Sequence, residues 1–525
     1  MISVDGADIQ QARLEEQVRQ ETRLLWEQKM GSSERDYIVA YLQYLLPREL
    51  EYINLHGKPP APRGGTLVFL VGYSLEPLLL SASLWKPERI VLVVNNTYGT
   101  EAGKARYCFT SDMLNRLAGK NRAFIVEPFI EVLRDDDPEQ VFAYLQRHLA
   151  GRPDLTIDIT GGKKSMVAGA FLFAAYSDTP VAYVDFDEYD ANFQRPYGYK
   201  CHVTALDNPY QKFALRDWEQ LKNSFLNNSF LTALELLRGI KNIPYFGDSH
   251  RQSMDSLETL LRMYRAWDNA DFAVAGDFRD RVDGLDPYEA PVILRYFAGS
   301  WPDAAGEPGK LLQKNVSEIR DIGRQASEKI LQKPERVYVY ARDELAKARR
   351  LVDPYEDYRA ALIRAAATSE LLVTARVWLL RSALVPETHR KSLQILAWSI
   401  SVKRRLLAEG RAEITEGKDR YQVSLEFTVA TGDRMLQKRK GLLENFKSQV
   451  DALEKLAEIR NSVVHGCMPV DRKLAGDCLA IAEKDAAEFR QWLAENVKHE
   501  VYEPVPWERV KEICGLQFVP EVRRA

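Results

Sequence analysis

Residues 156–170, TIDITGGKKSMVAGA, place an apolar strand directly before two glycines, two lysines and a helix rich in small residues. Glycine lets a backbone approach a ligand closely, and the first turn of a helix offers N–H groups at the positive end of its dipole. Lysine adds a positive charge. The turn is therefore suited to hold an anion such as phosphate. The alternative interpretation is a tight strand–helix turn that carries surface lysines.

The surrounding residues, from 66 to 206, alternate between apolar runs and stretches with helical character. TLVFLVGY (66–73) is continuously apolar, as is typical of a strand buried on both faces. Strands are also expected at RIVLVVNN (89–96), RAFIVEP (122–128), LTIDIT (155–160) and VAYVDFD (181–187), with an edge strand at GYKCHVTAL (198–206). The alternation predicts an α/β Rossmann-like domain with a doubly wound, mostly parallel sheet.

Small and polar residues follow three of these strands. Ligands of open parallel sheets bind outside the carboxyl ends of the strands, so these residues predict a pocket for a phosphate-bearing ligand. Neither Gly-x4-Gly-Lys-Ser/Thr nor Gly-x-Gly-x2-Gly occurs at these ends, which disfavours a standard NTPase or dinucleotide enzyme. The candidate residues are Gly72, Tyr73 and Ser74 after the first strand, Asn95, Asn96 and Thr97 after the second, and Thr160, Gly161, Gly162, Lys163 and Lys164 after the fourth.

The segment TGGKKSM (160–166) resembles the signature of CARF domains, the cyclic oligoadenylate sensors of type III CRISPR systems. The family pattern is close to Gly-Gly-Thr-Lys-x-Met, so that Gly161, Gly162, Lys164 and Met166 match it. Lys163 stands where threonine is usual, which replaces a polar contact by a cation suited to a polyphosphate. VGYS (71–74) is similar to the family's first ligand loop. The resemblance covers roughly residues 65–206 and implies a cyclic oligoadenylate ligand, with Met166 added to the candidate residues.

The remainder of the chain has a helical pattern, with a Pro/Gly-rich break at GKPPAPRGG (57–65). After Asn208, apolar residues recur every three or four positions to the end. We therefore expect four segments. They are a helical N-terminal extension and linker (1–60), a CARF ligand-sensing domain (61–207), a helical connecting region (208–350) and an all-α C-terminal region (351–525), the name of the second segment coming from the resemblance.

A second motif lies in the helix LAEIRNSVVHG (456–466), where Arg460 and His465 form Arg-x4-His. Gly466 follows as a residue suited to end the helix, which would place His465 in the last turn, accessible to solvent and able to titrate near neutral pH. Asn461 adds a neutral polar group. The alternative is a structural histidine stabilised by the helix dipole. A looser match, Arg195 and His202, precedes an edge strand and is interpreted as structural.

Behind a CARF-like domain, RNSVVHG resembles the HEPN ribonuclease motif of the Csm6/Csx1 group, which implies that residues 351–525 form a HEPN nuclease domain. The helix at 356–380 is similar to the family's first HEPN helix, where Arg364 and Glu370 either support the site or form an interhelical salt bridge. The resemblance implies metal-independent cleavage of single-stranded RNA to 2′,3′-cyclic phosphate and 5′-OH ends by a homodimer with a composite site. Arg460 would bind the scissile phosphate and His465 would transfer a proton. The activator would be cyclic oligoadenylate with an even number of units (cA4 or cA6).

Composition excludes or disfavours several classes of function and location. The net charge of −3 excludes a protein coated for non-specific duplex binding. Five scattered cysteines disfavour a disulfide framework. The first residues are unlike a signal peptide, and no apolar run is long enough to span a membrane. We therefore expect a cytoplasmic protein without a membrane partner. No clustered His/Cys motif predicts a metal or other cofactor. The acidic run of Asp185, Asp187, Glu188 and Asp190 is interpreted as a solvated rim.

Three other functions are compatible with the sequence. The chain could be a sensor whose helical part only dimerises or recruits a partner. It could also be a sensor coupled to an activity within residues 208–350. The third possibility is a ring nuclease that degrades its own activator, with Lys164 or Ser74 helping.

Overall fold

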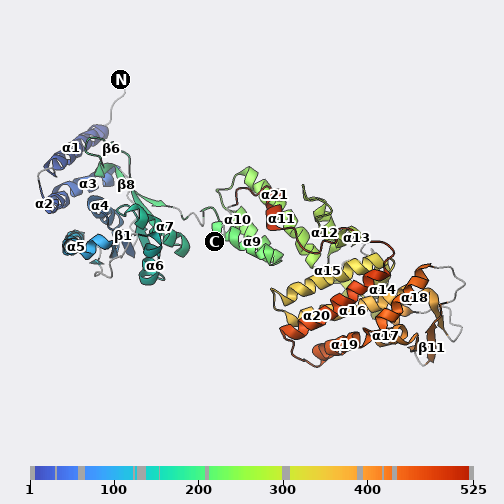
Figure 1. Ribbon diagram of the computed structural model, residues 1–525. Helices are drawn as coiled ribbons and strands as arrows, with labels where there is room; N and C mark the ends of the chain where they lie inside the picture. The colour runs from blue at the N-terminus through green and yellow to red at the C-terminus, as the bar shows by residue number, and fades with distance from the viewer. Residues whose placement is uncertain are drawn as a thin grey trace, which may run out of the picture. The chain divides into compact units, whose positions relative to one another are not determined.

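The computed structural model describes residues 6–29, 32–56, 65–121, 125–126, 137–152, 154–206, 208, 212–297, 308–386, 394–416, 419–427 and 434–519. These residues belong to two compact units, Met1–Arg216 and Asp217–Ala525 (Figure 1). The units are coarser than the four segments expected above, whose boundaries stay predictions. Most of the proposed linker, residues 57–64, lies outside the described residues. In the described part of the chain, no helix combines the length and apolar character needed to cross a membrane.

The first unit contains a six-stranded sheet in the order β3-β2-β1-β4-β5-β8. Five strands run parallel and β8 pairs antiparallel with β5 at the edge, which confirms the predicted mostly parallel sheet with an added edge strand. The strands are β1 (Thr66–Leu70), β2 (Arg89–Val93), β3 (Ile125–Val126), β4 (Leu155–Asp158), β5 (Val181–Phe186) and β8 (Cys201–Leu206).

Helices cover both faces of this sheet because its central strands are apolar on both sides. Successive side chains of a strand point to opposite faces. Leu67 and Phe69 of β1 accordingly pack with α4 (Glu76–Trp85) and α5 (Glu101–Asn121). The alternate residues, Val68 and Leu70, pack on the other face with α6 (Pro138–Leu149) and α7 (Lys164–Ser177). The sheet is therefore doubly wound, as the alternating pattern predicts.

The N-terminal helices extend the α4/α5 layer of the first unit. They comprise α1 (Gly6–Lys29), α2 (Glu34–Ala40), the π-helical turn η1 (Tyr41–Leu45) and α3 (Leu46–His56), and they share one hydrophobic core with α4 and α5.

The acidic rim is paired with α1. Arg19 bonds Glu188 at 2.7 Å and Arg23 bonds Asp190 at 3.2 Å. The Tyr197 hydroxyl, helped by backbone N–H groups and Arg23, lowers the pKa of Asp190 to about 2. Asp190 is buried and Glu188 is half-buried beside α1, so the expectation of a solvated rim is wrong for both. The docking of α1 is a long-range contact that no local pattern near residues 185–190 indicates.

The second unit is mainly helical, with α15, α16, α19 and α20 packed around one another (Figure 1). Its helices are α9 (Leu215–Leu226), α10 (Phe230–Lys241), α11 (Asp248–Asp268), α12 (Phe272–Arg279), α13 (Ile293–Phe297), α14 (Val316–Leu331), α15 (Pro334–Val352), α16 (Tyr358–Leu379), α17 (Ile400–Glu409), α18 (Arg434–Lys447), α19 (Val450–His465), α20 (Arg472–Phe489) and α21 (Trp507–Cys514).

The expected all-α region is wrong in one place. A three-stranded antiparallel sheet, in the order β10-β11-β9, is formed by β9 (Leu384–Pro386), β10 (Arg411–Glu416) and β11 (Asp419–Leu425). Its two-residue period is visible in the alternation of buried and exposed positions, with Ala412 and Ile414 buried on β10. Such short alternation between helices is hard to separate from a helical pattern.

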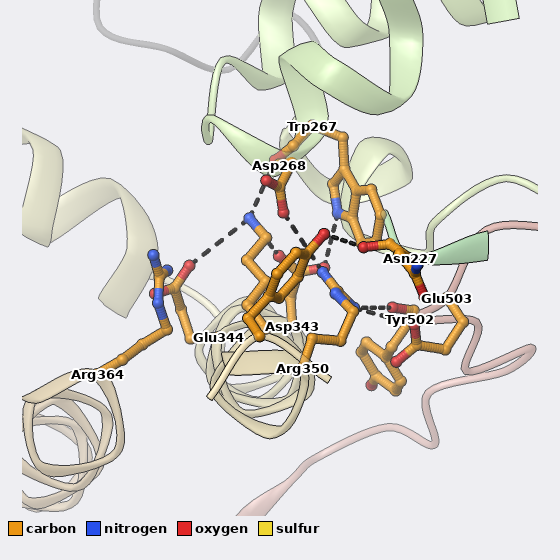
Figure 2. A network of polar contacts seen from close by, with 11 residues as sticks. Asn227, Trp267, Asp268, Asp343, Glu344, Arg350, Arg364, Tyr502 and Glu503 are labelled. Carbon is orange, nitrogen blue, oxygen red and sulfur yellow. Dashed lines mark hydrogen bonds and ion pairs between the residues drawn. The ribbon is translucent and has the colours of Figure 1, made fainter. Parts of the chain in front are cut away.

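Buried charges connect the helices of the second unit. Lys347 of α15 is 3% exposed and lies 3.1 Å from Asp343, and its ammonium donates to the Trp267 carbonyl of α11. The Trp267 indole N–H donates to Asp343 at 2.8 Å, which closes the group (Figure 2). Unpaired buried charges are costly, so each member fixes the position of the others.

A second buried pair joins α16 to α20. Arg376 and Asp485, which are 1% and 0% exposed, approach to 2.7 Å. The Arg376 guanidinium also lies against three aromatic rings, those of Phe446, Phe489 and Trp492. Burial raises the pKa of Asp485, although Arg376 opposes this shift. The guanidinium therefore favours the charged form of this carboxyl group in the core.

We expect Arg376→Met to destabilise the second unit by about 3–5 kcal/mol, because it leaves the Asp485 carboxylate buried without its partner. The double variant Arg376→Met/Asp485→Leu should recover most of this loss, since it removes both charges. Urea unfolding of the full chain, followed by circular dichroism, measures both. A double variant no more stable than the single one would contradict the assignment.

Candidate functional site

A cavity of about 420 Å³ lies at the carboxyl ends of β2, β1 and β4, where the sequence predicts a ligand pocket. Predicted residues line it from all three strand ends. The lining consists of Gly72, Tyr73, Asn95, Thr97, Tyr98, Thr100, Ala102, Gly103, Arg106, Gly161, Gly162 and Lys163.

The glycines of this cavity are required by the close approach of two loops. A methyl group built on Gly72 would lie 1.7 Å from the carbonyl oxygen of Gly161, and one on Gly161 would lie 2.8 Å from the carbonyl oxygen of Leu70. No side chain fits at either position without moving backbone. The two loops therefore pack backbone against backbone, and peptide groups form the floor of the cavity.

Positive potential at the cavity comes from the start of α7 and from lysine. Lys163 is the N-cap residue of α7, with ψ of 154°, and its side chain makes no capping hydrogen bond. The first N–H groups of a helix have no partner within the helix, so this end can bind an anion. Lys163 also lines the cavity.

The other predicted ligand residues lie outside this cavity. Ser74 and Thr160 line a neighbouring cavity, and the Thr160 hydroxyl accepts a hydrogen bond from the Val184 N–H at 2.8 Å. Asn96 and Lys164 are exposed, whereas Met166, in the first turn of α7, is fully buried in the core between α7 and the sheet. The structure thus gives Met166 a packing position.

Sequence reasoning missed the basic residue Arg106 on α5. Its guanidinium lies 5.4 Å from the centre of the Tyr73 ring and bonds Glu34 of α2 at 2.8 Å. Arg106 also donates to the Tyr73 carbonyl, so it connects α2, the loop after β1 and the cavity. The only available signal was the glycine-containing stretch YGTEAGKARY (98–107) after the second strand.

The second candidate site lies on α19, which ends at His465 as expected. Arg460 pairs with Glu370 of α16, and the two side chains are 27% and 20% exposed. Asn461 is half-buried and His465 is exposed in the last turn. The left-handed residue after the helix is Cys467, with φ of 53°, whereas Gly466 has φ of −100°.

Arg460 and His465 do not converge within one chain. On an ideal helix, residues five apart differ by about 140° around the axis and by about 7.5 Å along it. In the described part of the chain, no hydrogen bond joins the two side chains. A site that uses both groups on one phosphate therefore needs either the reach of the long arginine or a second copy of the chain.

Two buried cations of α17 flank the Arg460–Glu370 pair and were not predicted. Lys403 is 3% exposed and donates to the Thr374 hydroxyl of α16 at 3.3 Å. Burial lowers the pKa of Lys403 to about 8, with Glu370 opposing the shift. Arg404 is 5% exposed, and burial lowers its pKa as well. Their only sequence signal is the basic run VKRR (402–405).

Arg364 and Glu370, considered together in the sequence, have different partners. Arg364 turns to Glu344 of α15, beside the Lys347 group (Figure 2), while Glu370 holds Arg460. Both interactions are interhelical salt bridges, which was the alternative interpretation. Among the described residues, no group of three or more His, Cys, Asp or Glu side chains is placed to hold a metal ion.

Comparison with known proteins agrees with the motifs. No protein-family model matches the chain. The chain is 30% identical over 146 residues to the CRISPR system endoribonuclease Csm6 of Thermus thermophilus, a match covering 26% of this chain and 30% of the relative. The match thus spans less than a third of that relative. It confirms over this segment the predicted resemblance to Csm6.

A solved structure, Enterococcus italicus Csm6 bound to cyclic hexa-2′-fluoro-hexa-dAMP, aligns with 87% of this chain and 100% of that chain at 13% identity. The TM-score is 0.36, which is too low to establish a common fold.

We expect Gly72→Ala to destabilise the first unit by about 1–3 kcal/mol, because its methyl group would clash with the Gly161 carbonyl. Gly99→Ala is the matched control, since a methyl group there meets nothing within 4 Å. Its effect should stay within about 0.5 kcal/mol. Thermal unfolding compares the two variants, and equal midpoints would show that the loops do not pack as described.

Proposed function

We propose that this chain is a cyclic oligoadenylate-activated, metal-independent endoribonuclease that cleaves single-stranded RNA in type III CRISPR antiviral defence. It acts in the cytoplasm as a homodimer of CARF–HEPN chains. The observation that carries the proposal is the Csm6-like sequence, and it is supported by a cavity at the CARF-like loop that is lined by Lys163 at the start of α7. The Arg-x4-His helix of the second unit supplies the chemistry.

The cavity binds phosphates of the activator. Backbone N–H groups at the start of α7 and the Lys163 ammonium supply the donors, and Arg106 adds a second cation. Tyr73 offers an exposed aromatic ring, which is 82% accessible and suited to stack on a base. Asn95 and Thr97 supply polar groups at the neighbouring strand end.

Cleavage uses the 2′-hydroxyl of RNA as the nucleophile, so the protein must align it, stabilise charge on the phosphate and move a proton. Arg460 binds the scissile phosphate through its guanidinium, while Glu370 fixes the orientation of that side chain. His465 transfers a proton to the 5′-oxygen or from the 2′-hydroxyl, and Asn461 adds a polar contact. The products carry 2′,3′-cyclic phosphate and 5′-OH ends.

Dimerisation and activation follow from the separate roles of Arg460 and His465. A second copy supplies another Arg460 and His465, which completes a composite site that one helix does not close. An activator changes activity only if it binds better to the conformation with the better aligned site. A two-fold dimer places two cavities in one symmetric site, which fits a ring with an even number of adenylates, cA4 or cA6.

A second candidate is a cyclic oligonucleotide sensor that cleaves no RNA. It is favoured by one observation, namely that Glu370 already neutralises Arg460 while the His465 side chain makes no hydrogen bond within the described part of the chain. Ring degradation by the cavity is the remaining alternative.

We expect the purified chain to cleave fluorescent single-stranded RNA in EDTA when one of the two rings, cA4 or cA6, is present. His465→Ala should reduce the rate at least about 100-fold, because it removes the group that moves the proton. His202→Ala, from the structural Arg/His pair, is the matched control and should retain full activity. If the chain binds the ring but cleaves no RNA, the sensor function would remain as the only one of the two. If the ring itself is consumed, the chain degrades its activator.

The two lysines of the turn should respond differently to substitution. Lys163 lines the cavity whereas Lys164 is exposed beside it. Lys163→Ala should therefore raise the ring concentration for half-maximal binding by about tenfold or more, since it removes a charged phosphate contact. Lys164→Ala should change it less than about threefold. Fluorescence anisotropy with a labelled ring measures both, and the reverse order would place the phosphate on the other lysine.

A further inference from the structure

A second cavity of the first unit, of about 240 Å³, adjoins the candidate phosphate cavity. The two cavities border the same pair of loops, with Tyr73 and Gly161 lining one and the adjacent Ser74 and Thr160 lining the other. The N-terminal helices form one wall of it. Its lining includes Trp26, Tyr37, Tyr41 and Glu49 from that segment, together with Tyr183 and Arg195 from the rest of the unit.

A buried carboxyl group faces this mostly aromatic and aliphatic lining. Glu49 is 1% exposed, and its Oε2 accepts a hydrogen bond from the Tyr41 hydroxyl at 2.8 Å. Within the described residues this is the only hydrogen bond of the carboxyl group. Its Oε1 lies so close to Gly198 that a methyl group there would approach to 2.2 Å.

The chemistry of Glu49 suits a neutral partner with paired hydrogen-bonding groups. Burial raises the pKa of Glu49 to about 7, against the lowering effect of the Tyr41 hydroxyl and with a further increase from Glu76. The protonated form is therefore well populated at neutral pH, and it presents one O–H donor beside one acceptor. Adenine offers the complementary pair, an amino N–H next to a ring nitrogen.

The size and walls of the cavity also fit a single base. Sites for whole drug-sized ligands usually enclose about 300–1,000 Å³, so this cavity is too small for a complete nucleotide. Aromatic side chains bind the flat faces of bases by stacking. Arg195, which bonds Glu76 at 2.9 Å and the Tyr37 hydroxyl at 3.0 Å, is already neutralised, so a phosphate is the less suitable occupant.

We propose that this cavity takes one adenine base of the ligand whose phosphate lies on Gly161–Lys163, with Glu49 reading the edge of the base. The inference rests on the proposed function and assigns a role to the N-terminal helices, which lie outside the CARF-like segment. The ion pairs of Arg19 and Arg23 with Glu188 and Asp190 hold α1 next to the strand ends that this cavity borders, and Trp26 of α1 lines its wall.

The test measures binding of the full chain to cA4 and cA6 and to rings of the same size in which adenine is replaced by purine, which stacks alike but lacks the 6-amino group, by calorimetry. The wild type should prefer adenylate. Glu49→Leu should weaken adenylate binding at least about tenfold and leave binding of the purine rings within about twofold. Glu49→Gln should stay within about threefold, because an amide also presents a donor and an acceptor. Lys163→Ala should weaken both rings alike.

Three results would overturn the inference. Adenylate affinity unchanged in a folded Glu49→Leu variant would do so while leaving the proposed function intact, as would an equal loss for both bases. A wild type that binds neither adenylate ring would overturn the inference and the proposed function together.

A measurement on the unmodified protein covers the case in which Glu49→Leu fails to fold, as judged by its melting curve. A ring that carries 8-azidoadenine keeps the 6-amino group, and on irradiation it should crosslink to residues that line this cavity, as located by mass spectrometry of the digested protein. Crosslinks confined to Tyr73 and the other residues of the phosphate cavity would equally overturn the inference.

Discussion

The contact between the loops after β1 and β4 is the constraint on which the first unit depends. The peptide backbone around Gly72 lies so close to Gly161 that no side chain fits between them. This contact brings the end of one central strand and the start of α7 into a single surface made of peptide groups. Two cavities border that surface, one with a helix N-terminus and Lys163, the other with aromatic side chains and Glu49. The first cavity thus suits a phosphate and the adjoining second cavity suits a base.

The second unit depends instead on charges buried between helices, and α16 is the helix they share. Arg376 of α16 holds Asp485 of α20 in the core, and Glu370 of the same helix holds Arg460 of α19. Through Arg364 and Glu344, α16 is also connected to the buried Lys347 group of α15 (Figure 2). A displacement of α16 would therefore move the guanidinium proposed to bind RNA. Interhelical ion pairs of this kind fix geometry more than they add net stability.

Much of the first unit could be predicted because its chemistry is local in sequence. Continuous apolar runs mark the strands, and the glycines mark the points where they end. The CARF-like motif TGGKKSM (160–166) was less informative about individual residues, because some of its positions serve packing and others could serve binding. Met166 is buried on the core side of α7 and Lys164 is exposed on the same helix, although both match the motif. Arg106 could not be assigned to the cavity, since its position depends on how α5 follows the second strand.

Long-range docking limited the rest of the prediction. Nothing local in residues 26–49 shows that this segment covers strand ends more than 100 residues later in the sequence, so the second cavity was not foreseen. Lys403 and Arg404 were missed for the same reason, because only the folded bundle places them beside Glu370. The sheet of β9, β10 and β11 was missed because its short alternating strands lie between helices.

The pairing of Arg460 with Glu370 is compatible with the proposed chemistry. A guanidinium carries five N–H donors arranged around a plane, and a carboxylate on one edge leaves the other edge able to bind a phosphate. An isolated arginine would lose more conformational entropy on binding RNA, because its long side chain has many rotamers. Glu370 restricts those rotamers in advance, at the cost of some positive charge. Lys403 and Arg404 offset that cost, because they keep the surroundings of the pair positive while remaining buried.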